Sequence, residues 1–314
     1  MKCLLTGGAG FVGSHLARAL LDQGVELHGV GTEPTHGGLP LESWHVADVR
    51  ELEGVRRAVA AVKPDLVLHL AGQSSAARSF ERPLETFHAN ALGTWNVLES
   101  VRREAPRARA LVIGSGEVYG PQPEGTRTAE AAPFRPVSPY ALSKAAADLL
   151  AELAASIHGV DAVRTRSFSH TGPGQAPTFI VPSVAQQLAA IEQGRSEPVL
   201  KVGNLDVTRD LSDVRDVVRA YVALLERGRA GAVYNVCRGE GVRLTEVIDR
   251  LVRRARVPIR VEVDPSRYRP ADVPYLVGDR GAIERDTGWQ PEIPLDRTLD
   301  DCVEEWRART APVA

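Results

Sequence analysis

A glycine-rich segment near the start of the chain constrains its fold more than any other feature. Glycines recur at every third position between an apolar strand, Cys3–Leu5, and a segment with helical periodicity, Ser14–Gln23. This spacing permits a tight turn and a close approach to the backbone, and the helix N-terminus attracts phosphate groups. The alternative is a tight turn without a ligand. Because the segment lies in the first strand–helix unit, it predicts a dinucleotide site. The residues of this predicted site are Gly7, Gly10, Phe11, Val12 and Gly13.

Apolar strands alternate with helical segments through the first half of the chain. The predicted strands are Val25–Val30, Asp65–Leu70, Ala110–Gly114 and Ala162–Arg166. The predicted helices are Leu52–Val62, Pro83–Glu104 and Ser138–His158. This alternation is typical of an α/β protein with a Rossmann-type, doubly wound parallel sheet.

After about Phe168 the pattern changes to short strands and helices in mixed order. The predicted strands are Val199–Val202, Val233–Val236 and Ile259–Val263, and the predicted helices are Val181–Gln193, Val214–Arg227, Leu244–Ala255 and Asp296–Thr310. We expect a smaller, mixed α/β C-terminal lobe, with a ligand cleft between the lobes. Residues 1–167 are assigned to a dinucleotide-binding domain to which 206–236 return, and 168–205 and 237–314 to a substrate-binding lobe.

Composition argues against several classes of protein. The net charge of the 314 residues is −2, without a long basic run, so no nucleic-acid partner is expected. No apolar window is long enough for a membrane span, and the N-terminus lacks a signal-peptide pattern. Cys3, Cys237 and Cys302 are widely spaced and odd in number, which indicates a reducing cytoplasm without disulfides. The histidines share no spacing typical of a metal site, and we expect no metal.

Several acidic and apolar residues extend the predicted cofactor site. Glu33 follows Gly13 by twenty residues, where a carboxylate binds adenosine ribose hydroxyls and repels a 2′-phosphate. This favours NAD over NADP, although a solvated loop glutamate is an equally good interpretation. Asp48 and Val49 are placed beside the adenine, with a helix N-cap as the alternative for Asp48. Leu70, Ala71 and Gly72, where the strand Asp65–Leu70 ends, are also assigned to the dinucleotide.

Tyr140 and Lys144 lie four residues apart in the predicted helix Ser138–His158. At this spacing the two side chains share one helical face. A nearby ammonium favours the phenolate, so we expect the pKa of Tyr140 to fall and its phenol to exchange a proton with a carbonyl or alcohol oxygen. The alternative is an exposed tyrosine beside a solvated lysine. The predicted nucleotide site in the same chain favours the catalytic interpretation.

Ser115 ends the strand Ala110–Gly114, and Glu117 follows two residues later. Together with the Tyr140–Lys144 pair, this arrangement resembles the extended short-chain dehydrogenase/reductase superfamily along the full chain. The resemblance implies a triad in which Ser115 binds the reacting oxygen, Tyr140 is the acid or base, and Lys144 holds the nicotinamide ribose. Asn90 matches the family's helix asparagine, and a buried amide bound to backbone is its other interpretation.

Motifs in the second half narrow the resemblance. The segments Ser169–Gln175, Lys201–Asp210, Tyr234–Cys237 and Arg269–Pro274 are similar to those of GDP-4-keto-6-deoxy-D-mannose reductases, relatives of GDP-mannose 4,6-dehydratase. The resemblance implies that Arg209 and Arg269 contact the diphosphate and Asp272 the ribose of GDP, chemistry that suits guanidinium and carboxylate groups. The alternative for each of the two arginines is a surface ion pair. Ser75, Ser169 and His170 are also assigned to the substrate.

Two departures from the family pattern bear on the reaction. Ser169 replaces the usual asparagine, and Gly116 leaves empty the position where sugar-nucleotide dehydratases often carry an acid beside the glutamate. Glu117 occurs in both reductases and dehydratases, so it does not separate them. The expected reaction is reduction of the C4 keto group of GDP-4-keto-6-deoxy-D-mannose to GDP-D-rhamnose by NADH or NADPH. The alternatives are a GDP-mannose 4,6-dehydratase, a nucleotide-sugar 4-epimerase, and a non-catalytic dinucleotide-binding regulator.

The helix Ser138–His158 carries more apolar residues than one core face needs. Members of the family that the chain resembles usually dimerise through this helix and the Pro83–Glu104 helix, which form a four-helix bundle. We therefore expect a homodimer, and burial of the helix beneath the sheet is the alternative.

Overall fold

The structure is a computed structural model that describes residues 1–34, 38–268 and 272–310. Its main sheet has seven strands in the order β10-β6-β5-β4-β1-β2-β3. Every neighbouring pair is parallel. The strands are β1 Lys2–Thr6, β2 Glu26–Gly31, β3 Ser43–Val46, β4 Leu66–His69, β5 Arg109–Ser115, β6 Asp161–Ser167 and β10 Val233–Val236. The predicted doubly wound parallel sheet is therefore confirmed.

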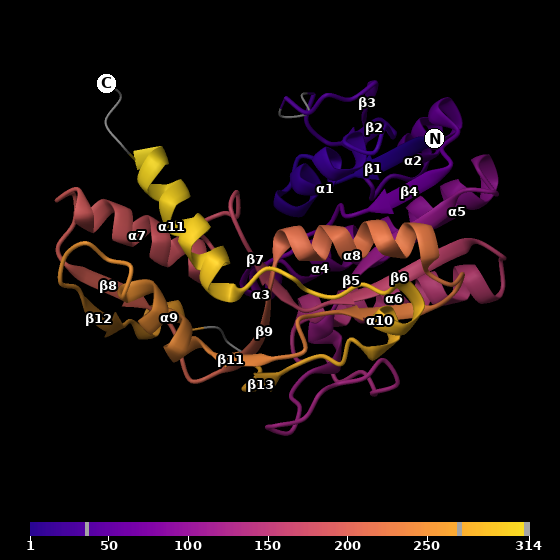
Figure 1. The fold of residues 1–314 in the computed structure, drawn as a ribbon. Coiled ribbons are helices and arrows are strands. Elements are labelled where there is room, and N and C mark those ends of the chain that lie inside the picture. Colours follow the sequence, from indigo (N-terminus) through magenta and orange to yellow (C-terminus); the bar gives the residue numbers. More distant parts are fainter. Residues whose placement is uncertain (35–37, 269–271, 311–314) are drawn as a thin grey trace.

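Helices cover both faces of this sheet (Figure 1). On one face, buried residues of α1 (Phe11–Leu21) and α8 (Val214–Arg227) form one hydrophobic cluster with the strands, and α10 (Gly281–Thr287) joins them. On the other face, α2 (Leu52–Val62), α5 (Gly93–Glu104) and α6 (Pro139–Ser156) form a second cluster. Burial on both faces explains the apolar runs within β1, β4 and β5. The short helices α3 (Ala76–Glu81) and α4 (Pro83–Phe87) precede α5.

The predicted single helix from Pro83 to Glu104 has the expected ends but an interrupted middle. Between α4 and α5, residues His88–Leu92 form a π-helix that contains the buried Asn90. Such a bulge inserts an extra residue into the turn, which hydrophobic periodicity does not reveal.

The smaller lobe contains the remaining strands and three helices, on the left of Figure 1. Strands β11, β9 and β13 are neighbours in that order, β7 also pairs with β9, and β12 pairs with β8 in parallel. The strands are β7 Ser169–Thr171, β8 Val199–Val202, β9 Thr208–Asp213, β11 Gly241–Arg243, β12 Arg260–Val263 and β13 Tyr275–Leu276. The helices are α7 Ile180–Glu192, α9 Leu244–Val252 and α11 Leu295–Thr310, and they share a third hydrophobic cluster.

The chain crosses between the lobes more than once. β9 pairs with β7 in the smaller lobe, whereas α8 packs on the main sheet and β10 joins its edge. The predicted return of residues 206–236 thus contributes elements to both sheets, and the domain boundaries stay a prediction. Three aspartates at the β9–α8 junction bind later parts of the chain. Asp210 accepts N–H bonds from Arg238, Gly239 and Gly278, Asp213 accepts from Thr298, and Asp216 accepts from Glu292 and Ile293.

Candidate active site

Helix α6 presents Tyr140 and Lys144 to the end of β5. The helix begins at Pro139, and the Ser138 hydroxyl accepts a hydrogen bond from the N–H of Ala141 at 3.0 Å. This N-cap, with proline in the first turn, fixes where the helix starts. It places Tyr140 in the first helical turn and Lys144 in the second, as the spacing predicted.

Lys144 is bound to the strand that carries Ser115. Its Nζ donates a hydrogen bond to the carbonyl oxygen of Ile113 at 2.9 Å. Burial lowers the pKa of Lys144 to about 8, because an apolar environment disfavours the ammonium form. A Cβ atom at Gly72 would lie 3.9 Å from this Nζ and 2.6 Å from Oδ1 of Asn90, so only glycine fits there.

The prediction of a lowered pKa for Tyr140 is wrong for this structure. Burial of the phenol raises its pKa, the charge of Glu117 adds to the rise, and a hydrogen bond with Ser115 opposes it. Desolvation dominates because Tyr140 is only 9% exposed. The ammonium of Lys144 does not contribute to the shift in the pKa of Tyr140, and it is hydrogen-bonded to the carbonyl oxygen of Ile113. Tyr140 therefore remains a neutral phenol that holds a proton, and the raised pKa makes it a weaker acid than an exposed tyrosine.

Ser115 and Glu117 complete the cluster around Tyr140. Ser115 ends β5, is buried, and accepts the backbone N–H of Glu117 at 3.2 Å. Its neighbour in the sheet register is Ser167 of β6, whose hydroxyl bonds the Tyr221 hydroxyl at 2.7 Å. The structure thus brings the four predicted catalytic residues together at the carboxyl edge of the sheet.

Asn90 is a buried amide bound to backbone, in agreement with the second interpretation of this residue. Its Oδ1 accepts the N–H of Gln73 at 2.8 Å, and its Nδ2 donates to the carbonyl of Gln73 and to the Ser143 hydroxyl. Ser143 in turn donates to the carbonyl of Tyr140 at 2.7 Å. Asn90 therefore links the loop after β4 to the first turn of α6. A direct contact with the cofactor stays a prediction.

The glycine-rich loop is shaped for a phosphate group. Gly7 has a φ of 74°, and a Cβ there would lie 2.7 Å from the nitrogen of Ala71. A Cβ at Gly13 would lie 2.4 Å from the Gly7 carbonyl, so the helix starts directly against the loop. No side chain caps α1 at Gly10, and its first turn holds no acidic residue. The N–H groups of this turn are thus available to a pyrophosphate, and the residues present fit a dinucleotide.

Glu33 and Asp48, both assigned to the adenosine, differ in their surroundings. Glu33 is exposed after β2, and its carbonyl accepts the indole N–H of Trp44 at 2.8 Å. Asp48 binds the Arg50 guanidinium, which holds the pKa of that carboxyl below its usual value. The N-cap of α2 is Glu51, so Asp48 is not the cap. Val49 is buried against Gly93. Adenosine contacts by these residues remain predictions.

The residues assigned to the GDP moiety include a close ion pair. Arg209 of β9 binds Asp272 with 2.6 Å between Nη2 and Oδ1, and Asn204 donates to the other carboxylate oxygen at 3.1 Å. Arg209 also donates to the carbonyl of Thr208 at 3.0 Å. Both members of the pair are mostly buried. Arg269 lies outside the described residues.

The three other described residues assigned to the substrate lie in different parts of the fold. Ser75 is the N-cap of α3, where its hydroxyl accepts the N–H of Arg78 at 3.2 Å. Ser169 is exposed on β7, next to β9. His170 donates from Nδ1 to the carbonyl of Phe168 at 3.0 Å and stacks on Phe11, and burial lowers its pKa. His170 thus lies against the glycine-rich loop, and contact with a sugar stays a prediction for all three.

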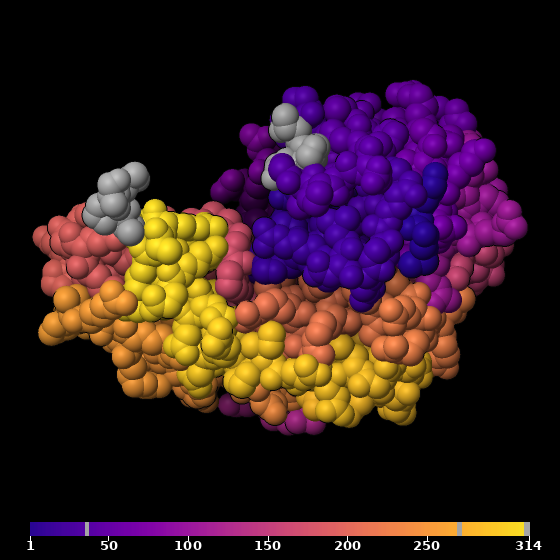
Figure 2. Space-filling view, turned by 45° about the horizontal axis from the view of Figure 1, so that its top comes forward, coloured from indigo at the N-terminus to yellow at the C-terminus, as the bar shows by residue number. Residues whose placement is uncertain are grey.

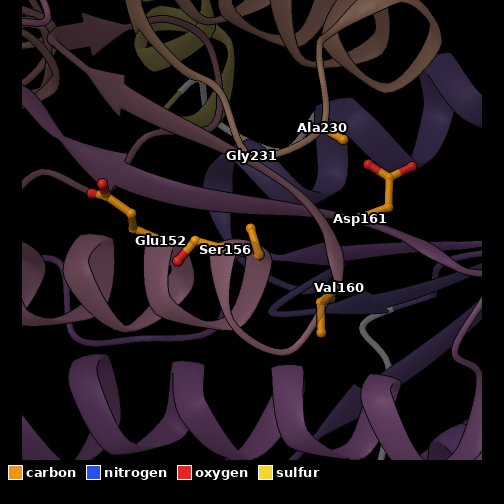
Figure 3. Close-up of a pocket in the computed structure, with 8 residues that line it drawn as sticks. Glu152, Ser156, Val160, Asp161, Ala230 and Gly231 are labelled. Atoms are coloured by element: carbon orange, nitrogen blue, oxygen red, sulfur yellow. The ribbon is translucent and has the colours of Figure 1, made fainter.

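The surface is hollowed at the boundary between the lobes and again near the end of α6. Figure 2 shows a notch between the lobe of α7 and α11 and the indigo N-terminal segment. A separate hollow of about 450 Å³ lies at the other end of α6, lined by Glu152, Ser156, Val160, Asp161 and Gly231, among others (Figure 3). Val160 and Asp161 precede and begin β6, so this hollow is at the amino edge of the sheet, away from Tyr140.

Sequence reasoning missed His15, which contacts a loop of the other lobe. Its Nε2 lies 2.8 Å from the carbonyl oxygen of Pro173, and its ring meets Phe11 edge-on. The available signal was its position one turn after Phe11 on the same face of α1. Within the described part of the chain, no group of three or more His, Cys, Asp or Glu side chains is arranged to hold a metal ion.

The fold and the Ser115–Tyr140–Lys144 cluster define a short-chain dehydrogenase/reductase of the extended type, and comparisons specify the family. The GDP-mannose 4,6-dehydratase family matches residues 4–302. GDP-6-deoxy-D-mannose reductase of Pseudomonas aeruginosa is 36% identical over 310 residues, covering 98% of both chains. GDP-mannose 4,6-dehydratase of Vibrio cholerae is 29% identical and covers 96% of this chain and 92% of its own. The chain belongs to the GDP-mannose 4,6-dehydratase family.

Solved structures agree with this assignment. RMD from Pseudomonas aeruginosa, complexed with NADPH, superposes with a TM-score of 0.86 at 34% identity, over 98% of this chain and 99% of that one. UDP-glucose 4-epimerase of Thermus thermophilus, in complex with NAD, has a TM-score of 0.88 at 30% identity, with the same coverage. The predicted family and enzyme class are confirmed: the protein is an NAD(P)-dependent oxidoreductase.

Proposed function

We propose that this enzyme reduces the C4 keto group of GDP-4-keto-6-deoxy-D-mannose with NADH or NADPH and releases GDP-D-rhamnose. The observation that carries the proposal is the placement of Tyr140 against Ser115 and Glu117, at the end of β5. Its phenol holds a proton and is hydrogen-bonded to Ser115, and Lys144 of the same helix is bound to the strand that ends in Ser115. Reduction of a ketone requires a proton donor at the developing alkoxide, and a neutral phenol supplies one.

The residues of the cluster divide the work of this reduction. The reduced nicotinamide, when bound, supplies the hydride to C4. The Ser115 hydroxyl holds the carbonyl oxygen, and Tyr140 transfers its phenolic proton to that oxygen as negative charge develops. Lys144, anchored at Ile113, binds the nicotinamide ribose. The cluster thus positions both the reacting oxygen and the cofactor.

The Arg209–Asp272 pair supports a nucleoside diphosphate at the other end of the substrate. A guanidinium suits phosphate oxygens and a carboxylate suits the ribose diol. In the ligand-free protein each group satisfies the other, so binding exchanges this contact for contacts to GDP. Ser75, Ser169, His170 and Arg269 are proposed to bind the sugar-diphosphate between this pair and Tyr140.

A 4,6-dehydratase is the second candidate, because Glu117 lies close enough to Tyr140 for its charge to raise the pKa of the phenol. A dehydratase would use Glu117 to remove the C5 proton. Position 116 argues against it. A Cβ there would lie 3.0 Å from the Phe168 ring, so an acidic side chain beside Glu117 would need that ring to move.

We also propose a homodimer in the cytoplasm. The outer face of α6 exposes Leu142, Leu149, Leu153 and Ile157, of which Leu149 is 55% exposed. An apolar row of this size on one helix is typical of an interface. The three cysteines are buried free thiols, as in a reducing compartment. Over the described residues, no helix combines the length and the apolar character that crossing a membrane requires.

The proposed function is tested by adding the keto sugar nucleotide and either reduced dinucleotide to the purified enzyme. We expect loss of the reduced-nicotinamide absorbance band and formation of a GDP-6-deoxyhexose. No absorbance change with either dinucleotide would contradict the proposal.

A further inference from the structure

The end of β7 and the loop that follows it lie between the C-terminal helix and the first turn of α1. We define the clasp loop as residues 170–175, of which the first two end β7. On one side, the ring of His170 stacks on Phe11 with 6.2 Å between centroids and 15° between planes, and His15 donates from Nε2 to the carbonyl of Pro173 at 2.8 Å. On the other side, the N–H of Gly174 donates to Oε2 of Glu305 in α11 at 2.9 Å. The clasp loop therefore lies between two helices of different lobes. In Figure 2 a pink band separates the yellow of α11 from the indigo of the N-terminal segment.

The conformation of the clasp loop leaves little freedom. The Thr171 hydroxyl donates to Oε1 of Gln175 at 2.7 Å, and Nε2 of Gln175 donates back to the carbonyl of His170. A Cβ at Gly172 would lie 2.6 Å from Val214, and Gly174 has a φ of 92°, which favours glycine. The clasp loop therefore connects Glu305 to Phe11 and His15 through a constrained backbone.

The clasp loop contacts the start of α1 from outside the helix. Helix ends fray unless something holds them, and α1 has no side-chain cap at Gly10. Within the helix, the Ser14 hydroxyl donates a hydrogen bond to the carbonyl of Phe11, and this bond does not connect the turn to the rest of the protein. From outside the helix, the clasp loop contacts Phe11 and His15, and Val12 packs against the core of the main sheet. The same turn presents the N–H groups that face the pyrophosphate.

We propose that Glu305 is a positioning residue for dinucleotide binding, although it lies on α11 and touches no cofactor. Its carboxylate holds Gly174, the clasp loop then holds Phe11 and His15, and the first turn of α1 keeps its N–H groups aimed at the pyrophosphate. Arg309 pairs with the other oxygen of Glu305 at 2.8 Å and keeps the carboxylate oriented. The inference rests on the dinucleotide site described above.

The test measures dissociation constants of reduced dinucleotide by fluorescence for the purified full-length protein. Glu305→Ala removes a charge-assisted hydrogen bond, and we expect its dissociation constant to rise about tenfold. Glu305→Gln retains an acceptor for Gly174 and should stay within about threefold of the parent. The matched control is Glu304→Ala, since Glu304 forms surface ion pairs with Arg307 and Arg256 and does not contact the clasp loop. At saturating dinucleotide, kcat of Glu305→Ala should stay within about twofold.

The inference would be overturned if Glu305→Ala bound the dinucleotide as tightly as the parent. It would also be overturned if Glu305→Ala and Glu304→Ala lost the same amount of dinucleotide affinity. If Glu305→Ala does not fold, as judged by its melting temperature without dinucleotide, His15→Leu decides, because it releases the clasp loop from the opposite side. A tenfold loss there supports the inference, and unchanged affinity overturns it. If the parent protein binds neither dinucleotide, the cofactor site itself is contradicted, which is a different result.

Discussion

Lys144 donates a hydrogen bond to the carbonyl oxygen of Ile113, and this bond joins helix α6 to the strand that ends in Ser115. The distance is 2.9 Å, and the carbonyl that accepts the bond lies two residues before Ser115. The proposed proton donor Tyr140, the proposed oxygen-binding hydroxyl of Ser115 and the proposed cofactor-binding Lys144 therefore lie on one helix and one strand that are bonded to each other. This relationship is the basis of the predictions on chemistry below.

Replacing Tyr140 by phenylalanine should separate catalysis from binding. The change removes the phenolic proton and preserves the ring, so kcat should fall by about 10²-fold to 10⁴-fold. The dissociation constant of the dinucleotide should not change, and the melting temperature should stay close to that of the parent. Stopped-flow rates with fluorescence titrations measure both quantities. Turnover at the parent's rate would rule out Tyr140 as the acid.

The pKa of Lys144 predicts a pH dependence of cofactor binding. Because burial lowers this pKa from 10.5 to about 8, the ammonium loses its proton as the pH rises through 8, and dinucleotide affinity should decline there. The unfolded chain holds this proton up to about pH 10.5, so the group's contribution to the free energy of unfolding rises with pH between these values. Lys144→Met should bind weakly with no dependence on pH in this range. A flat affinity profile for the parent would contradict the assignment.

Glu33 should set the preference between the two dinucleotides. Its exposed carboxylate after β2 is expected to bind ribose hydroxyls and to repel a 2′-phosphate, so the parent should prefer NADH. Glu33→Ser should shift the NADPH-to-NADH ratio of kcat/KM upwards by about tenfold, equivalent to about 1.4 kcal/mol. Initial rates with each dinucleotide measure this ratio, and an unchanged ratio would show that the carboxylate stays in solvent.

The Arg209–Asp272 pair should contribute to the KM of the sugar nucleotide. Arg209→Met leaves Asp272 without its cation and removes the proposed diphosphate ligand, so this KM should rise at least about tenfold. Dinucleotide affinity should not change. The control is Arg243→Met, because Arg243 forms an exposed pair with Glu124. If both variants behave alike, Arg209 is no more than a surface ion pair.

The dimer proposal depends on the apolar outer face of α6. Leu149→Glu combined with Leu153→Glu places two charges in the proposed interface, and light scattering should then report a monomer. Val261→Glu is the control, since Val261 is comparably apolar and exposed but lies on β12 of the other lobe. A parent protein that is already monomeric would refute the proposal.

The spacing of residues in the sequence was enough to locate the helices and strands that hold the proposed catalytic and cofactor-binding residues. Gly7, Gly13 and Tyr140 lie where spacing and strand order placed them, because a parallel sheet brings its loops to one edge. The pKa of Tyr140 was mispredicted because spacing to Lys144 is local, whereas burial depends on everything packed around the ring. Periodicity predicts a regular helix around Asn90, whereas the residue lies in a π-helix and its side chain bonds Gln73 and Ser143, which are distant in sequence.

The contacts that join the lobes were beyond sequence reasoning. His15 and Pro173 are separated by 158 residues, and Gly174 and Glu305 by 131. The spacing of His15 from Phe11 indicates only a shared face of α1, and no signal in the sequence identifies the partner in either pair. The ion pair of Arg209 with Asp272 is similar: both residues were assigned to GDP, but their attraction for each other appears only when β9 and the segment before β13 are adjacent.

The central claim is net reduction of a sugar ketone, and the most direct measurement is stoichiometry. The enzyme is incubated with GDP-4-keto-6-deoxy-D-mannose and reduced dinucleotide, and in parallel with GDP-mannose alone, and the nucleotide sugars are separated by chromatography. The account predicts one dinucleotide oxidised for each GDP-D-rhamnose formed, and no conversion of GDP-mannose. Conversion of GDP-mannose to the keto sugar without net oxidation of dinucleotide would contradict it.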